Sequence, residues 1–173
     1  VPTKHVVVAS MGDLLGAAYG RWITFAERHL AKMVPAYDIP LTNGRKVLTY
    51  ADLKSLFPDP DGREPSRTIE LHLTGNMERY TWSFDGLEFG SSTPVHFKHG
   101  ERVRVILQND TMMTHPMHMH GLWSELETAE GKFQARRHTI PVQPAQRISF
   151  LVNADAVGRW AWHCHLMFHM HAG

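Results

Sequence analysis

The only cysteine of this 173-residue chain lies in a histidine-rich segment, Trp162 to Gly173, and this segment constrains the fold more than any other feature. In a β-strand, successive side chains point to opposite faces. If the segment enters as a strand, His163 and His165 share one face and Cys164 points to the other. One tripeptide can therefore contribute to two different sites.

A second histidine-rich segment, HPMHMHG at residues 115–121, supplies further donors. His118 and His120 share a face by the same alternation. His115 lies beyond a proline, which breaks regular strand pairing, so it can turn elsewhere. We expect two groups of donors: one of His115, Cys164 and His169, and another of His118, His120, His163 and His165.

The donor types indicate which metal these groups bind. A thiolate is a soft ligand and imidazole a borderline one, and one Cys with two His is the ligand set of electron-transfer copper centres, usually with a weak axial Met. Structural zinc sites usually show several Cys or two Cys with two His. A Cys–His catalytic nucleophile would leave five further histidines unexplained. Copper is therefore predicted. A further hypothesis is that the histidine-rich loops only buffer zinc or copper.

Other polar and aromatic residues receive simpler interpretations. Trp82 and the other tryptophans of the second half are expected to pack in the core or at a seam. Glu125 and Glu127 could face a Cu(I) substrate site, although carboxylates after a strand are usually solvated. The remaining histidines are interpreted as surface or hydrogen-bonded core residues: His5, His29, His72, His96, His99 and His138.

A period of two indicates strands in the second part of the chain. Apolar residues alternate with polar ones in three stretches: Ile69, Leu71 and Leu73; Val103, Val105 and Leu107; and Ile148, Phe150 and Val152. Turn residues separate these stretches at short intervals. The pattern predicts an all-β sandwich over residues 66–173.

The first part of the chain has a different character. Residues 13–34 are predicted to form a helix, because apolar residues recur at three- and four-residue steps and Asp13 can cap its start. Proline and glycine punctuate residues 35–65, which indicates a loop-rich connector. Residues 1–65 are thus predicted to form a helical extension with a connector, ahead of one sandwich domain.

The net charge of +1 does not provide the field that nucleic acids or anionic membranes attract. No apolar run reaches the roughly 18 residues of a membrane span. The first residues lack the charged start and the apolar length of a signal peptide.

The two histidine-rich segments, HPMHMHG and HCHLMFHMHAG, resemble the copper motifs in the C-terminal cupredoxin domain of multicopper oxidases. The segments LTGNMERYTWSFDG, ERVRVILQNDTMMTHPMHMHG and GRWAWHCH resemble the bacterial copper-resistance protein A branch more closely than laccases. The resemblance runs from about Arg45 to Gly173. It implies a cupredoxin-like Greek-key β-sandwich, copper as the cofactor and a periplasmic location.

The resemblance also implies a role for each donor. His115, Cys164 and His169 would bind the type 1 (blue) copper, His118 the type 2 copper, and His120, His163 and His165 the type 3 pair. Cys164, His163 and His165 would carry the catalytic electron transfer from the blue copper to the trinuclear cluster. The implied enzyme is an oxidase that takes electrons from Cu(I) or a phenolic reductant and reduces dioxygen to water.

Part of the family pattern lies outside this sequence. The axial Met would fall one residue past Gly173, and the first cupredoxin domain of the family supplies two His-x-His motifs that residues 1–110 do not contain. We expect an internal fragment or truncated product, completed by an N-terminal cupredoxin domain of the same protein or by a partner chain. The alternative is a non-catalytic copper-binding or electron-transfer module. Some relatives carry a proton-delivering carboxylate just after the blue-site histidine. Met170 and His171 follow it here, so any such role would fall to His171 or to no residue.

Overall fold

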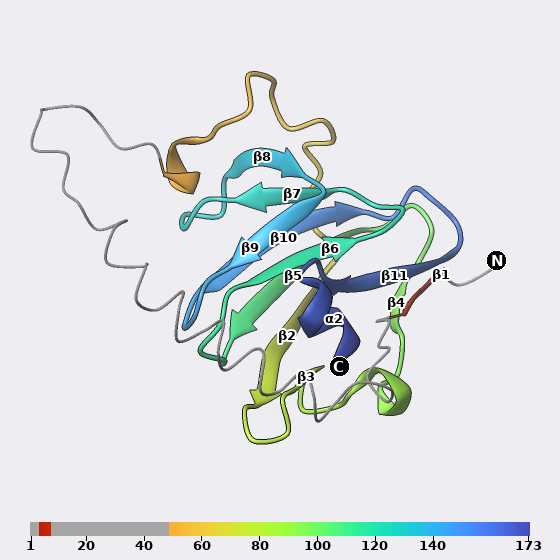
Figure 1. The fold of residues 1–173 in the computed structure, drawn as a ribbon. Coiled ribbons are helices and arrows are strands. Elements are labelled where there is room, and N and C mark those ends of the chain that lie inside the picture. Colours follow the sequence, from red (N-terminus) through yellow and green to blue (C-terminus); the bar gives the residue numbers. More distant parts are fainter. Residues whose placement is uncertain (1–3, 8–48) are drawn as a thin grey trace, which may run out of the picture.

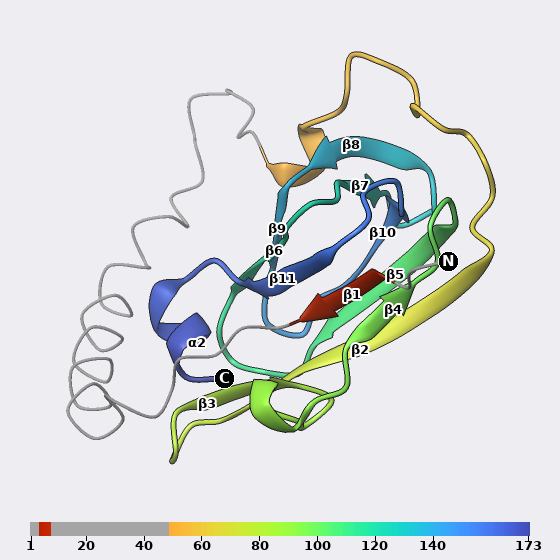
Figure 2. The same cartoon turned by 90° about the vertical axis from the view of Figure 1, so that its right-hand side faces the viewer.

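The computed structural model describes residues 4–7 and 49–173, whose strands form two packed sheets. One sheet has five strands in the order β4-β1-β11-β6-β9, and the other has six in the order β3-β2-β5-β10-β7-β8. Figures 1 and 2 show these two layers from perpendicular directions. The predicted all-β sandwich is therefore confirmed.

The elements are short, as expected for a sandwich. The strands are β1 (Lys4–Val7), β2 (Arg67–Asn76), β3 (Thr81–Phe84), β4 (Val95–Phe97), β5 (Arg102–Asn109), β6 (His115–Met119), β7 (Ser124–Glu127), β8 (Phe133–Arg137), β9 (Thr139–Val142), β10 (Arg147–Asn153) and β11 (Arg159–Cys164). The helical elements are two 3-10 turns, Tyr50–Asp52 and Phe89–Ser91, and the helix α2 (Met167–His171).

Strands that pair in space lie far apart in the chain. β5 pairs in parallel with β2 and in antiparallel with β10, and β11 pairs in antiparallel with β6. Such long connections between paired strands are typical of Greek-key sandwiches. They bring the two histidine-rich segments onto neighbouring strands of one sheet.

The core lies between the sheets and follows the predicted alternation. Val103, Val105 and Leu107 of β5 are completely buried, and Phe150 and Val152 of β10 face them in the same layer. The remaining core positions are Leu71, Leu73, Phe97, Met117, Met119, Leu122, Ile140, Val142, Ala154, Trp162 and Cys164. Cys164 is thus on the core side of its strand.

The polar residues that alternate with the core along β5 are not all exposed, because Arg102 is only 1% exposed. The connector covers it. The backbone N–H of Ser66 donates to the Arg102 carbonyl at 2.8 Å, and Gln134 of β8 donates to the Tyr50 carbonyl at 2.8 Å. Figure 1 shows this orange-to-yellow segment beginning beside β8, looping above it in the view and descending to β2. The predicted boundary at Ser66 stays a prediction, and residues 49–65 bind to the sandwich.

The predicted helix at residues 13–34 lies outside the described residues. Within residues 4–7 and 49–173, no helix combines the length and the apolar character needed to cross a membrane. The chain leaves β11 at Cys164 and turns into α2, where the Ala172 carbonyl accepts a hydrogen bond of 2.9 Å from the Trp82 backbone. This bond ties α2 to β3.

Candidate metal centre

Strand pairing brings the two histidine-rich segments together. The antiparallel register of β6 and β11 places His118 opposite His163, and residues opposite each other project to the same face of a sheet. Beyond the end of β11, the His165 backbone N–H donates to the Pro116 carbonyl at 2.6 Å. The predicted alternation across β11 is confirmed: the histidines that flank Cys164 lie on one face and Cys164 on the other.

His115, Cys164 and His169 form the first predicted group, called here the buried trio. Their relative exposures are 3%, 8% and 2%. One donor atom from each lies within 4.8 Å of the others. The Nδ1 atoms of His115 and His169 are 3.1 Å apart, and the Cys164 Sγ is 3.5 Å from the His169 Nδ1. The trio therefore presents one sulfur and two nitrogens to a single point.

Trp82 of β3 covers the buried trio. Its ring centroid lies 4.8 Å from that of His115 and 4.5 Å from that of His169, and the indole is itself buried. The sequence indicated packing for this tryptophan, and the structure shows that its partners are the donors themselves. An apolar cover of this kind excludes water and lowers the local dielectric around a metal site.

Burial keeps the trio neutral in the absence of metal. It lowers the pKa of His115 to about 4, and burial together with the His115 charge lowers the pKa of His169 to about 3. Burial also raises the pKa of the Cys164 thiol to about 11, although the Leu166 backbone N–H opposes this shift. A metal that binds the thiolate must therefore displace a proton.

The depressed histidine pKa values predict acid-sensitive stability of the metal-free chain. Between about pH 6.5 and pH 4 the unfolded histidines bind protons that the folded ones do not, so the free energy of unfolding falls as the pH falls. Each histidine contributes a slope of up to about 1.4 kcal/mol per pH unit. Urea unfolding at about pH 7 and about pH 5 measures the difference.

A double variant, His115→Gln with His169→Gln, is the control for this prediction. It lacks both titrating groups and should show a clearly shallower loss of stability over the same pH range. Equal slopes for the variant and the unmodified chain would contradict the assignment to these two histidines.

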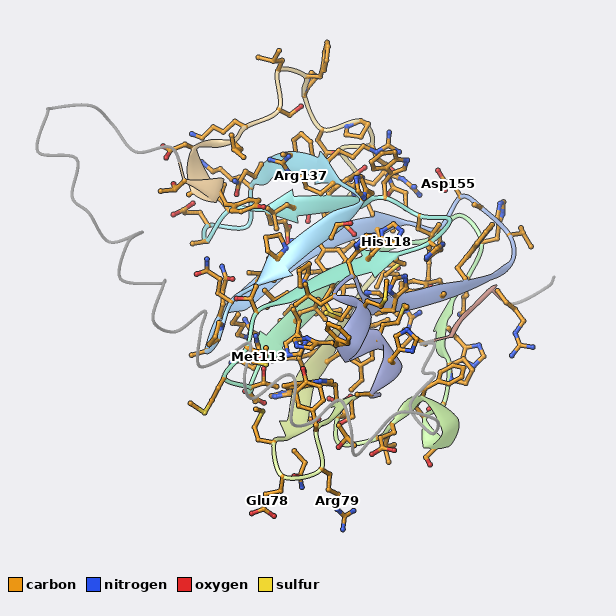
Figure 3. All side chains as sticks on the ribbon, viewed as in Figure 1. Glu78, Arg79, Met113, His118, Arg137 and Asp155 are labelled. Atoms are coloured by element: carbon orange, nitrogen blue, oxygen red, sulfur yellow. The ribbon has the colours of Figure 1, made fainter. Side chains whose placement is uncertain are left out.

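His118, His120, His163 and His165 form the second predicted group, called here the open histidine group. The rings of His118 and His120 are 4.6 Å apart, and the Nε2 atoms of His120 and His163 are 3.0 Å apart. The rings of His163 and His165 stack at 6.0 Å. All four are partly or fully exposed. Figure 3 labels His118 on β6 and Met113 just before the start of that strand, and the two lie well apart in the view.

Two hydrogen bonds fix which ring nitrogen of this group is free. The His118 Nδ1 lies 2.5 Å from the His138 carbonyl, and the His163 Nδ1 lies 2.9 Å from the Cys164 carbonyl. A carbonyl only accepts, so both Nδ1 atoms carry the proton and both Nε2 atoms keep a lone pair. Bonds of this type orient metal-binding histidines.

The sequence indicates a surface or hydrogen-bonded core residue at His138, and it gives no sign that the His138 backbone carbonyl contributes to the site. It lies beside His118 because β9 pairs with β6, with Thr139 opposite His118. Every residue carries a carbonyl, so no side-chain signal could have identified this one. Only the strand register reveals it.

Gly121 lets the chain turn directly after the second histidine-rich segment. Its φ of 70° lies in the left-handed region that favours glycine. A Cβ at this position would overlap the ring of Trp160, which packs against the backbone here. The backbone conformation and the packing against Trp160 both require a glycine at the end of HPMHMHG.

Glu125 and Glu127 do not belong to the site, so the expectation that they face a substrate or solvent is wrong. Both are buried in ion pairs, Glu125 with Arg102 at 3.0 Å and Glu127 with Arg104 at 2.9 Å. His72, by contrast, is an exposed surface residue paired with Asp110, as interpreted.

The two groups suit a metal of soft to borderline character. The sulfur and two imidazole nitrogens of the buried trio match a copper centre better than a zinc site built from several Cys. The open histidine group offers only imidazole nitrogens and leaves a side open to solvent.

Known proteins share both the sequence and the fold. The family model for multicopper oxidase matches residues 62–173. Copper resistance protein A of Pseudomonas syringae pathovar tomato is 65% identical over 131 residues, which cover 76% of this chain and 22% of that protein. Copper resistance protein A of Escherichia coli is 64% identical over 131 residues, which cover 76% of this chain and 22% of that protein. The chain thus spans about a fifth of the length of these relatives.

Solved structures agree on the fold. A laccase-like multicopper oxidase from Ochrobactrum aligns with a TM-score of 0.56 at 21% identity, over 67% of this chain and 31% of that one. The iron-import oxidase Fet3p aligns with a TM-score of 0.56 at 17% identity, over 77% of this chain and 36% of that one. The sandwich is therefore cupredoxin-like, as the resemblance implied. The chain belongs to the multicopper oxidase family, as a domain related to copper resistance protein A, and the family implies copper as its cofactor.

Proposed function

We propose that this chain is the C-terminal copper-binding domain of a periplasmic multicopper oxidase that acts in copper resistance. The similarity to relatives named copper resistance protein A supports the biological role. In this proposal, the buried trio holds the type 1 copper. His118 contributes to the type 2 copper, and His120, His163 and His165 contribute to the type 3 pair.

The observation that carries the proposal is the position of Cys164 between two ligand groups. Its side chain lies beside His115 and His169 in the buried trio. Its neighbours in the chain, His163 and His165, belong to the open histidine group. Copper bound at both places would supply one-electron oxidation of the reductant and reduction of dioxygen. The backbone around Cys164 joins the two places by a short covalent path.

The surroundings of each group match its proposed task. The buried trio is covered by Trp82, so the protein can exclude water and fix the ligand geometry there. The open histidine group faces solvent, so a second set of donors can approach it. We propose that these donors come from an N-terminal cupredoxin domain of the same protein or from a partner chain. Cu(I) or a phenol serves as the electron donor.

The alternative is a copper-binding or electron-transfer module without oxidase turnover. The exposure of the open histidine group favours it, because the described residues supply only one side of a ligand cage there. Oxygen consumption by the full-length protein separates the two functions.

In the full-length protein, His120→Ala should lower the rate of oxygen consumption by a hundredfold or more, since loss of one metal-binding side chain exceeds the roughly 10- to 100-fold cost of losing a supporting group. The visible band of the buried trio should remain, because His120 lies on the other face of the sheet. An oxygen electrode and an absorption spectrum measure both. His72→Ala, at an exposed site elsewhere, is the matched control.

Two outcomes would contradict the oxidase function. Unchanged oxygen consumption in His120→Ala would remove the open histidine group from the reaction. A full-length protein that shows the copper band but consumes no oxygen with Cu(I) or a phenol would establish the electron-transfer module instead.

A further inference from the structure

Asn109, at the end of β5, has a fixed side-chain amide. It is completely buried, and its Nδ2 donates one hydrogen to the Met113 carbonyl at 2.7 Å and the other to the Val142 carbonyl at 2.9 Å. Two carbonyls can only accept, so the nitrogen of the amide must face them. The Oδ1 atom is therefore left as an acceptor with a defined direction.

Thr111 lies against that acceptor and against the buried trio at the same time. Its backbone N–H and its hydroxyl both donate to the Asn109 Oδ1, at 2.9 Å and 2.7 Å. The same hydroxyl oxygen lies 2.8 Å from the Nε2 of His115. A hydroxyl has a single hydrogen. The hydroxyl oxygen also lies 3.1 Å from the Met113 carbonyl, so two oxygens that can only accept surround it. When the hydrogen points to either of them, Thr111 can only accept from His115.

With the hydroxyl hydrogen directed at one of these two oxygens, the tautomer of His115 follows. Its Nε2 carries the proton and donates to Thr111, so its Nδ1 keeps the lone pair. That Nδ1 is the atom that faces the His169 Nδ1 at 3.1 Å, next to Cys164. The hydrogen-bond chain therefore runs from His115 through Thr111 to Asn109, and it leaves the lone pair on the side of the sulfur.

We infer that Thr111, held by Asn109, is a positioning residue that fixes the orientation and the tautomer of His115 for copper. This inference rests on the proposed function, because the free lone pair on the His115 Nδ1 is needed only if the buried trio binds a metal. The hydrogen-bond chain itself is present without metal. Metal-binding histidines depend on such partners at their second nitrogen.

The first test uses the copper-free, 15N-labelled chain near neutral pH. Long-range 1H–15N spectra report which ring nitrogen of His115 carries the proton. We expect the Nε2-protonated tautomer in the unmodified chain, retention of it in Thr111→Ser, and a mixture of tautomers in Thr111→Val. Thr114→Val is the matched control, since that hydroxyl forms no hydrogen bond with His115 in the described part of the chain.

The second test measures Cu(II) binding at the buried trio by its visible band. Thr111→Val should lose about 10- to 100-fold in affinity, as expected when a metal-binding histidine loses its supporting partner. Thr111→Ser should recover most of it. If Thr111→Val does not fold, Thr111→Ala beside Thr111→Ser makes the same comparison.

The outcomes separate this inference from the function on which it rests. No copper band in the unmodified chain would overturn the type 1 site, while the tautomer in the copper-free spectra would still decide the role of Thr111. A normal band together with an unchanged tautomer and affinity in Thr111→Val would overturn the positioning role alone.

Discussion

Replacing Cys164 with serine should abolish the intense visible band of the Cu(II)-loaded chain and remove the copper ion bound at the buried trio. The band requires a thiolate bonded to Cu(II), and Cys164 is the only cysteine of the sequence. Serine has nearly the same shape but offers a hydroxyl in place of the soft sulfur. Absorption spectra and copper analysis after desalting measure both effects.

The matched control for Cys164→Ser removes a donor from the other group. His120→Ala deletes an imidazole of the open histidine group, on the opposite face of the sheet, and should leave the band unchanged. A band that survives in Cys164→Ser would contradict the assignment of the sulfur to the metal.

Arg102→Met should lower the free energy of unfolding by about 3–5 kcal/mol, the usual cost of leaving a buried charge without its partner. The Arg102 guanidinium bonds Asp59 at 2.6 Å and Asn153 at 3.1 Å, and pairs with Glu125 at 3.0 Å. Burial raises the pKa of Glu125, because it disfavours the ionised carboxylate, and the Arg102 charge opposes this shift. Urea unfolding of the metal-free chain measures the loss.

Two further variants test this network. Arg147→Met breaks an exposed pair with Glu70 and should cost less than about 1 kcal/mol. Arg102→Met combined with Glu125→Gln should be less destabilised than the two single changes summed, because they share one interaction. If Arg102→Met were no more harmful than Arg147→Met, the charges would not hold the connector to the sheet.

Local rules predicted which of the candidate donors lie together in space. Alternation along a strand placed His163 and His165 apart from Cys164. The expectation that Pro116 breaks the strand was wrong, because β6 pairs with β9 through Pro116, and alternation along β6 is what separates His115 from His118. These are effects of neighbouring residues in one segment, which a sequence displays directly. The inward residues of β5 and β10 followed the same rule.

The rest depended on contacts between distant segments. Arg102 alternates with core residues and therefore looks solvated, but the connector folds back over it and brings Asp59. Glu125 likewise looked exposed until Arg102 was placed beside it. The His138 carbonyl reaches the site only through the pairing of β9 with β6. No local pattern encodes such partners.

An electron paramagnetic resonance titration of this chain with Cu(II), with copper counted per chain, tests most directly whether His115, Cys164 and His169 assemble a blue copper centre. The predicted result is one copper per chain with the narrow hyperfine splitting of such a centre, absent in Cys164→Ser. Only ordinary tetragonal signals, unaffected by that substitution, would contradict it and leave a histidine copper binder.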